Sequence, residues 1–105
     1  MIEIKAFIRR ARAADVIRGL IRAGFCKLTV IDVKSILKSL DDTEQDYSIE
    51  FGEEIITETK LELVCEGYEE AEVVKIIRKY GRSSQENSGW IYISSINFTY
   101  AIDGK

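Results

Sequence analysis

The densest group of chemically active side chains lies in the middle of the chain. From Asp41 to Glu54 there are seven carboxylates and no basic residue. Carboxylates bind Ca²⁺ or Mg²⁺, but the spacing does not match the EF-hand pattern. Tyr47, Ile49 and Phe51 place apolar side chains among the charges. This mixture favours a docking segment for a partner protein over a purely solubilising one.

Two segments that contain arginine could bind anions. Residues 81–89 combine Ser, Asn and Gly, a composition typical of a surface loop. Successive backbone amides beside Arg82 could equally hold an anion. The three arginines within residues 9–12 could form ion pairs at the start of a helix, or could bind an anion or an acidic partner.

The chain contains no His, which removes the commonest general base and the commonest transition-metal ligand. We therefore assign no catalytic and no metal-binding residue. Cys26 and Cys65 are too far apart for a zinc motif, and we expect two buried thiols. If Ile36 pairs with Ile55 across two antiparallel strands, however, the same register sets Cys26 opposite Cys65. A redox-responsive pair is the alternative.

Size and charge narrow the class of protein. The 105 residues suit one domain, and a domain of this size gains core by oligomerising. A net charge of −3 disfavours nucleic acid as a partner. No apolar run approaches the roughly 18 residues of a membrane span, and no secretory leader is present. We expect a cytoplasmic protein without direct membrane insertion.

Hydrophobic periodicity predicts two strand–helix–strand units. Asp15 is expected in the first turn of the first helix, and Gly24 at its end. The C-terminal tail could add a short strand or an interface arm. The predicted strands are residues 2–9, 26–36, 55–66 and 90–98, and the predicted helices are residues 14–23 and 69–80.

Two such units interleave into an α+β, ferredoxin-like βαββαβ sandwich. The expected sheet is four-stranded and antiparallel, with two helices on one face and a long loop between strands two and three. The other face would be bare, which favours self-association. Its predicted lining is Phe7, Thr29, Ile31, Val33, Trp90 and Tyr92.

The segments that form this framework resemble the PII signalling protein family. Residues 28–34 (LTVIDVK) resemble its second strand, residues 60–64 (KLELV) its third, and residues 81–94 its B-loop with the strand that follows. The resemblance implies one PII-like domain over residues 1–105. Its T-loop would span about residues 37–54, its B-loop about 81–89 and its tail 99–105.

Members of this family form trimers, bind adenine nucleotides in clefts between subunits, and contact partner proteins through the T-loop. By resemblance, the ligand-binding residues would be Thr29, Lys38, Gly81, Arg82 and Gly89. The partner-binding loop would present Asp41, Asp42, Glu44, Tyr47, Glu50 and Phe51.

Several positions depart from the family pattern. Trp90 stands where the family has a phosphate-binding lysine, and Ala101 and Asp103 replace two phosphate-binding arginines. Each charge-assisted contact contributes about 1.5–3 kcal/mol, so tight binding of ATP by the usual route is not expected. AMP, ADP, a cyclic nucleotide or a small anion fits better. Other departures are Ser35 and Leu37 for glycines, Ser39 for a glutamine, and Phe51 for the tyrosine that is uridylylated.

These observations predict a non-enzymatic, homotrimeric PII-like regulator, for example in nitrogen regulation. It would sense a small effector, with no covalent cofactor, and act on a partner such as a membrane transporter or an enzyme. Two alternatives stay open at this point. One is a PII-like interaction module that has lost nucleotide sensing. The other is a CutA-like metal-related protein.

Overall fold

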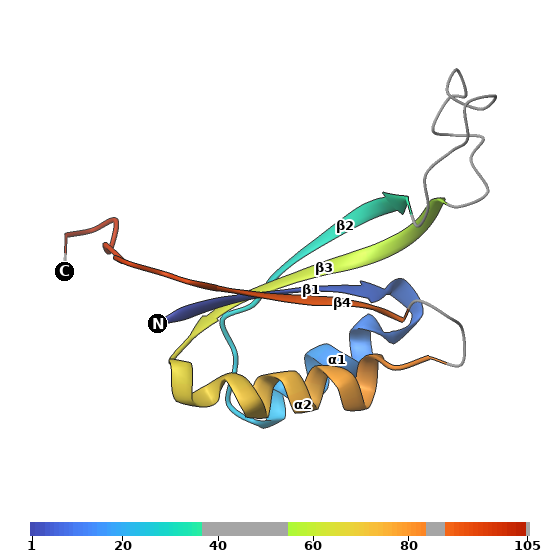
Figure 1. The fold of residues 1–105 in the computed structure, drawn as a ribbon, viewed down its shortest axis with the longest axis horizontal. Helices are drawn as coiled ribbons and strands as arrows, with labels where there is room; N and C mark the ends of the chain where they lie inside the picture. Colours follow the sequence, from blue (N-terminus) through green and yellow to red (C-terminus); the bar gives the residue numbers. More distant parts are fainter. Residues whose placement is uncertain (37–54, 84–87, 105) are drawn as a thin grey trace, which may run out of the picture.

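The computed structural model describes residues 1–36, 55–83 and 88–104. The chain alternates strands and helices in the order β-α-β-β-α-β (Figure 1). The elements are β1 (Ile2–Arg9), α1 (Arg10–Arg22), β2 (Thr29–Ile36), β3 (Ile55–Cys65), the short 3₁₀ helix η3 (Gly67–Glu69), α2 (Glu70–Gly81) and β4 (Gly89–Ser95).

The four strands form one antiparallel sheet in the order β2-β3-β1-β4, and both helices cover one of its faces (Figure 1). The predicted ferredoxin-like fold is therefore confirmed. The predicted register is confirmed as well, because Ile36 pairs with Ile55. The acidic segment predicted as the T-loop lies outside the described residues.

The core lies between the sheet and the two helices. Alternate residues of β1 and β3 point towards the helices, and one stripe of each helix packs on them. The buried cluster consists of Ile4, Ala6, Ile8, Leu61, Leu63 and Cys65 from the sheet and Val16, Leu20, Val73 and Ile77 from the helices.

Helix α1 begins at Arg10, directly after β1, and not at Ala14 as predicted. The reason is that the run of arginine and alanine before Asp15 has high helix propensity and needs no acidic first turn. Asp15 lies in the second turn, where it pairs with Arg12 and Arg18. Arg12 also donates from Nε to the carbonyl of Tyr80 at 3.0 Å, which ties the start of α1 to the end of α2.

The end of α1 is as predicted. Gly24 adopts a φ of +99°, its N–H donates to Ile21, and the N–H of Phe25 donates to Leu20. This pair of bonds is a Schellman motif, which satisfies the last carbonyls of the helix. In the middle of α1, Gly19 lets the two helices approach closely. A Cβ added there would lie 2.7 Å from the ring of Tyr80.

The 3₁₀ helix η3, which leads directly into α2, begins with a capping box. The backbone N–H of Glu66 donates to the carboxylate of Glu69 at 2.9 Å, and the Glu66 side chain accepts a bond in return. These bonds satisfy N–H groups that have no partner inside a helix. Acidic residues Glu70 and Glu72 lie in the first turn of α2, and basic residues Arg78 and Lys79 in its last, which suits the helix dipole.

Two strands are shorter than predicted, because residues at one end of each have no partner in the neighbouring strand. Strand β2 begins at Thr29, not Cys26, because Phe25 and Leu28 pack against the core and not in the ladder. Strand β4 ends at Ser95, not Phe98, because its ladder with β1 ends at the Ile2–Ser95 pair. One further bond, from the Ile96 N–H to the Met1 carbonyl at 3.0 Å, closes that end.

The second face of the sheet carries no helix (Figure 1). The register places the predicted lining residues on it, since Phe7 pairs with Trp90 and Ile31 with Lys60. The central strands carry two ion pairs on this face, Lys5–Glu3 at 3.7 Å and Lys60–Glu62 at 2.9 Å, beside the apolar side chain of Phe7. The open face thus combines apolar and charged side chains.

Candidate functional site

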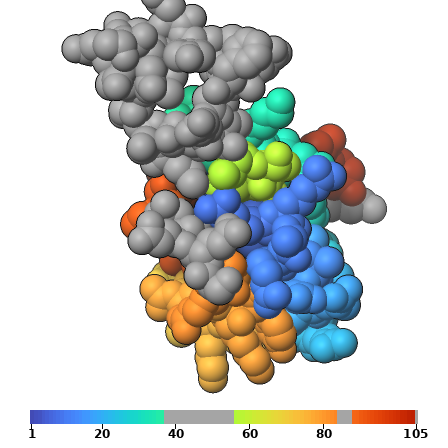
Figure 2. All heavy atoms as spheres, turned by 90° about the vertical axis from the view of Figure 1, so that its right-hand side faces the viewer, coloured from blue at the N-terminus to red at the C-terminus, as the bar shows by residue number. Residues whose placement is uncertain are grey.

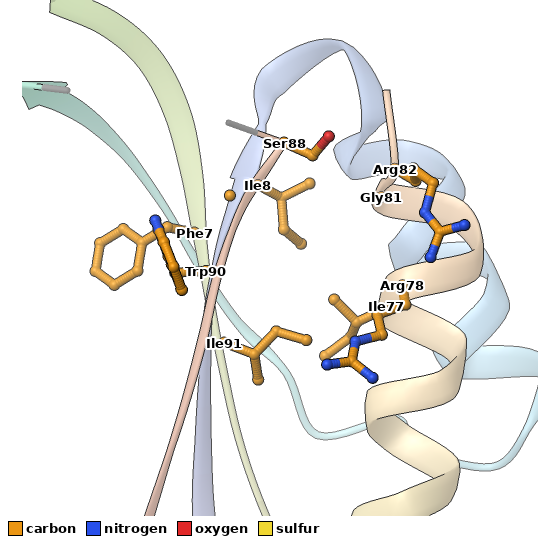
Figure 3. Close-up of a pocket in the computed structure, with 10 residues that line it drawn as sticks. Phe7, Ile8, Ile77, Arg78, Gly81, Arg82, Ser88, Trp90 and Ile91 are labelled. Carbon is orange, nitrogen blue, oxygen red and sulfur yellow. The ribbon is translucent and has the colours of Figure 1, made fainter. Parts of the chain in front are cut away.

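The first hollow of interest is a cavity of about 230 Å³ between the end of α2 and the start of β4. Figure 3 shows Ile8 and Ile91 extending from the sheet towards Ile77 of α2, with the guanidinium groups of Arg78 and Arg82 on the helix side. The full lining is Phe7, Ile8, Ile77, Arg78, Gly81, Arg82, Ser88, Gly89, Trp90 and Ile91.

Two glycines shape this cavity. Gly89 has a φ of +129°, and a Cβ added there would lie 1.8 Å from the backbone oxygen of Phe7. Only glycine fits this close approach of β4 to β1. Gly81 is buried, and a Cβ on it would lie 3.4 Å from Val16. Gly89 thus holds the start of β4 against β1 at the cavity, while Gly81 ends α2 beside it.

A serine pair joins the two ends of the predicted B-loop. The N–H of Ser83 donates to Oγ of Ser88 at 3.1 Å, and the two hydroxyl oxygens lie 3.2 Å apart. These contacts fix the chain on both sides of residues 84–87. They therefore hold Arg82 and Gly89 at the same end of the sheet.

The charge at this cavity is positive. Arg78 and Arg82 are exposed, and neither forms an ion pair with another described residue. Arg78 lies in the last turn of α2 and Arg82 is the residue after its end, and both line the cavity. Arg12 brings a third guanidinium to the same helix end through the carbonyl of Tyr80. Figure 2 views this end of the molecule, where the start of α1 (blue) lies beside the end of α2 (orange).

A second hollow, of about 360 Å³, lies on the open face of the sheet and is also lined by Gly89. Its floor is aromatic: the rings of Phe7 and Tyr92 meet edge to face, with centroids 5.9 Å apart. Trp90 is 66% exposed beside them. The lining is Phe7, Ser35, Ile36, Glu58, Gly89, Trp90 and Tyr92.

A third hollow, of about 480 Å³, lies at the opposite end of the sheet around Thr29. Its carboxylate Glu62 accepts a hydrogen bond from Lys60, which holds the pKa of Glu62 below its ordinary value together with the positive charges of Lys60 and Lys5. The lining is Met1, Glu3, Lys27, Thr29, Glu62, Leu63, Val64 and Thr99.

The predicted ligand-binding residues therefore fall into two groups. Gly81, Arg82 and Gly89 line one cavity, whereas Thr29 lines another. The topology explains the separation. Through Glu62, Thr29 lies in the row of Lys5 in the middle of β1, while Gly89 pairs with Ile8 near the end of β1. The two strands are also opposite edges of the sheet.

The remaining predicted site residues cannot be placed. Lys38 and the partner-loop residues Asp41, Asp42, Glu44, Tyr47, Glu50 and Phe51 all lie outside the described residues. Sequence reasoning also missed Arg78, which faces the cavity beside Arg82. The usable signal was its position one helical turn before Arg82 on the predicted helix.

The two cysteines are free thiols in the structure. Cys65 is buried in the core, where desolvation raises its pKa, helped by the nearby carboxylates of Glu69, Glu66 and Glu70. Cys26 is exposed, so the prediction of two buried thiols is wrong for it. It lies outside β2, because the ladder ends at the Thr29–Glu62 pair. The extrapolated Cys26–Cys65 pair is therefore not part of the sheet.

The arginines after β1 serve structural contacts. Arg10 pairs with Asp32 of β2 at 3.8 Å, and Arg12 binds both Asp15 and the end of α2. This agrees with the ion-pair interpretation of these residues. Within the described residues, no group of three or more His, Cys, Asp or Glu side chains could hold a metal ion.

Known proteins place this framework in context. No family model matches the chain. The chain is 29% identical to the nitrogen regulatory protein P-II of Pyropia yezoensis and 26% identical to that of Porphyra purpurea. Each match spans 96 residues, which is 91% of this chain and 86% of the relative. Each match therefore covers nearly all of the fold described above.

The chain is a distant homologue of nitrogen regulatory protein P-II. This homology indicates a non-enzymatic regulatory protein, as predicted. The same homology favours the PII interpretation over a CutA-like metal-related protein. Within the described residues, none of the helices is long and apolar enough to cross a membrane.

Proposed function

We propose that this PII-family protein is a homotrimeric signal-transduction protein. It binds a small adenine nucleotide or anion in clefts between subunits and regulates a partner protein through residues 37–54. One observation carries the proposal. Thr29 and the group around Arg82 lie at opposite corners of the sheet, so one copy of the chain cannot join them around a single ligand. A neighbouring copy can.

The surfaces available for such an assembly support the trimer. Trp90 and Tyr92 are more than half exposed on the open face. Beyond β4 the chain continues as an arm that leaves the body of the molecule (Figure 1). Phe98 is 77% exposed on this arm, Tyr100 87% and Ile102 fully. Several large apolar side chains exposed on the open face and the arm favour an interaction surface.

The chemistry of the clefts suggests the type of effector. Arg82 supplies a cation on one side, and Thr29 supplies a hydroxyl on the other. Trp90 replaces a phosphate-binding lysine and adds a broad ring on which a base can stack. Fewer cations with an added aromatic surface favour AMP, ADP or a cyclic nucleotide over ATP. The cytoplasmic location, the single-domain organisation and the identity of the partner stay predictions.

Light scattering coupled to size exclusion tests the assembly. The wild-type chain should elute as a trimer, and Trp90→Glu should elute as a smaller species because it buries a charge in the interface. Ile21→Glu is the matched control, since Ile21 is 48% exposed but lies on α1. A monomeric wild type at tens of micromolar protein would contradict the proposal.

Complementation tests whether the clefts lie between subunits. Thr29→Ala and Arg82→Gln should each abolish the stabilisation by AMP or ADP seen in a thermal shift assay. Refolding an equal mixture of the two variants should restore about one cleft in four, because a head-to-tail interface joins Arg82 of one copy to Thr29 of the next. Binding that fails to return in a mixed trimer would show that the two residues do not share a cleft.

The thermal shift assay also tests nucleotide sensing itself. Absence of stabilisation by AMP, ADP, cyclic nucleotides, ATP and bicarbonate alike would refute nucleotide sensing.

Trp90 also favours a second candidate, a PII-like interaction module that has lost sensing. A bulky exposed ring at this position, with Ala101 and Asp103 in the tail, leaves few groups for phosphate. Such a module would form the trimer, bind no nucleotide and still capture its partner. Deleting residues 40–53 should abolish the capture under both candidates, and only the thermal shift assay separates them.

A further inference from the structure

We propose that the cavity between α2 and β4 binds a small amphiphilic carboxylate, with its apolar end between Ile77 and Ile91 and its carboxylate at Arg78 and Arg82. This site goes beyond the nucleotide cleft. Ile8 and Ile91 point to the helix side of the sheet, whereas Phe7 and Trp90 lie on the other side (Figure 3).

The size and lining of the cavity set the apolar part of the ligand. Its volume of about 230 Å³ is below the roughly 300–1,000 Å³ of pockets for drug-sized molecules. A dry apolar cavity of about 150 Å³ already binds benzene. The hydrophobic walls come from Ile8, Ile77 and Ile91, so a chain of about six carbons or a single ring would fill the interior and leave room for a head group.

The two arginines set the polar part. Arg78 and Arg82 line the same cavity, one in the last turn of α2 and the other just after it, and an anion between two such cations forms charge-assisted contacts with both. The helix end opposes an anion with about half a negative charge. Two guanidinium groups outweigh it, and Arg12 already donates to the carbonyl of Tyr80 at that end. A planar carboxylate matches the fork of a guanidinium group.

Titration with hexanoate, followed by NMR of isoleucine methyl groups, tests the site in the full chain. Hexanoate should shift the Ile77 and Ile91 methyl signals saturably, and 1-hexanol should bind at least tenfold more weakly because it lacks the charge. Arg78→Gln should weaken hexanoate binding about tenfold or more. Lys75→Gln is the charge-matched control, since Lys75 lies on α2 but does not line this cavity.

A filling variant gives an independent readout. Ile91→Phe should abolish the saturable shifts while the fold, checked by circular dichroism, is retained. If Ile91→Phe does not fold, the comparison of Arg78→Gln with Lys75→Gln is the test of the proposal. Equal affinity for hexanol and hexanoate, equal losses in Arg78→Gln and Lys75→Gln, or shifts that do not saturate would overturn the proposal. Thr29→Ala removes a predicted nucleotide contact but lies outside this cavity, so hexanoate should shift the Ile77 and Ile91 signals in that variant as in the wild type. Failure of this site and failure of the nucleotide cleft are therefore distinguishable.

Discussion

Substituting Gly89 by alanine tests how β4 and the candidate cavity are held in place. Gly89 has a φ of +129°, in a region that residues with a Cβ adopt at a cost of about 1–3 kcal/mol. The new Cβ would also lie 1.8 Å from the backbone oxygen of Phe7, so the start of β4 must move away from β1. Loss of one backbone hydrogen bond there adds about 0.5–1.5 kcal/mol.

We therefore expect Gly89→Ala to lower the free energy of unfolding by about 2–4 kcal/mol. Urea denaturation at fixed protein concentration measures it, and the midpoint should fall without a change in slope. In thermal unfolding, the same loss lowers Tm by on the order of 10 °C or more.

Gly24→Ala is the matched control. Gly24 also has a positive φ, +99°, but no atom lies within 4 Å of an added Cβ. Alanine there should cost only about 1–2 kcal/mol of backbone strain. If Gly89→Ala is no more destabilising than Gly24→Ala, the close approach of β4 to β1 does not shape this end of the molecule, and the reasoning on the cavity fails.

Three further predictions concern the core, the thiols and the charged face. Leu20→Ala should lower the free energy of unfolding by about 2–5 kcal/mol, because Leu20 is fully buried; a loss below 1 kcal/mol in urea denaturation would contradict the packing. Iodoacetamide at pH 8 should modify Cys26 at least tenfold faster than Cys65, because burial raises the pKa of Cys65 and restricts access to it. Equal rates of modification, measured by mass spectrometry, would contradict the burial of Cys65. The lowered pKa of Glu62 stabilises the fold above the ordinary carboxyl pKa, and this contribution is lost as pH falls through the folded pKa. Lys60→Gln should therefore show a smaller loss of stability between about pH 5 and pH 3, measured by urea denaturation, than the wild type.

Much of the fold follows from local patterns. The alternation of β1 assigns Ile4, Ala6 and Ile8 to one face, and the structure buries all three. Gly24 was predicted to end α1 from its position alone, and it does. The start of α1 was missed, because Asp15 looks like a first-turn residue in the sequence and serves instead as a partner for Arg12 and Arg18.

The candidate site could be predicted only in part. The residue types around Arg82 and Gly89 indicated an anion site, because glycine spacing and a cation are visible in the sequence. Their separation from Thr29 was not visible, since it depends on which end of each strand lies beside β1. The contribution of Arg78 to the cavity also depends on how α2 lies against β4.

By itself, the sequence determined the order of strands and helices, the buried face of each and the resemblance to the PII family. These properties depend on periodicity and residue type, which are local. Only the tertiary structure decided where the strands end, because a strand stops where its ladder with a neighbour ends, as β4 does opposite Ile2. It likewise decided that Arg78 and Arg82 share one cavity while Thr29 lies at the far corner, because distances between elements arise only when the sheet is assembled.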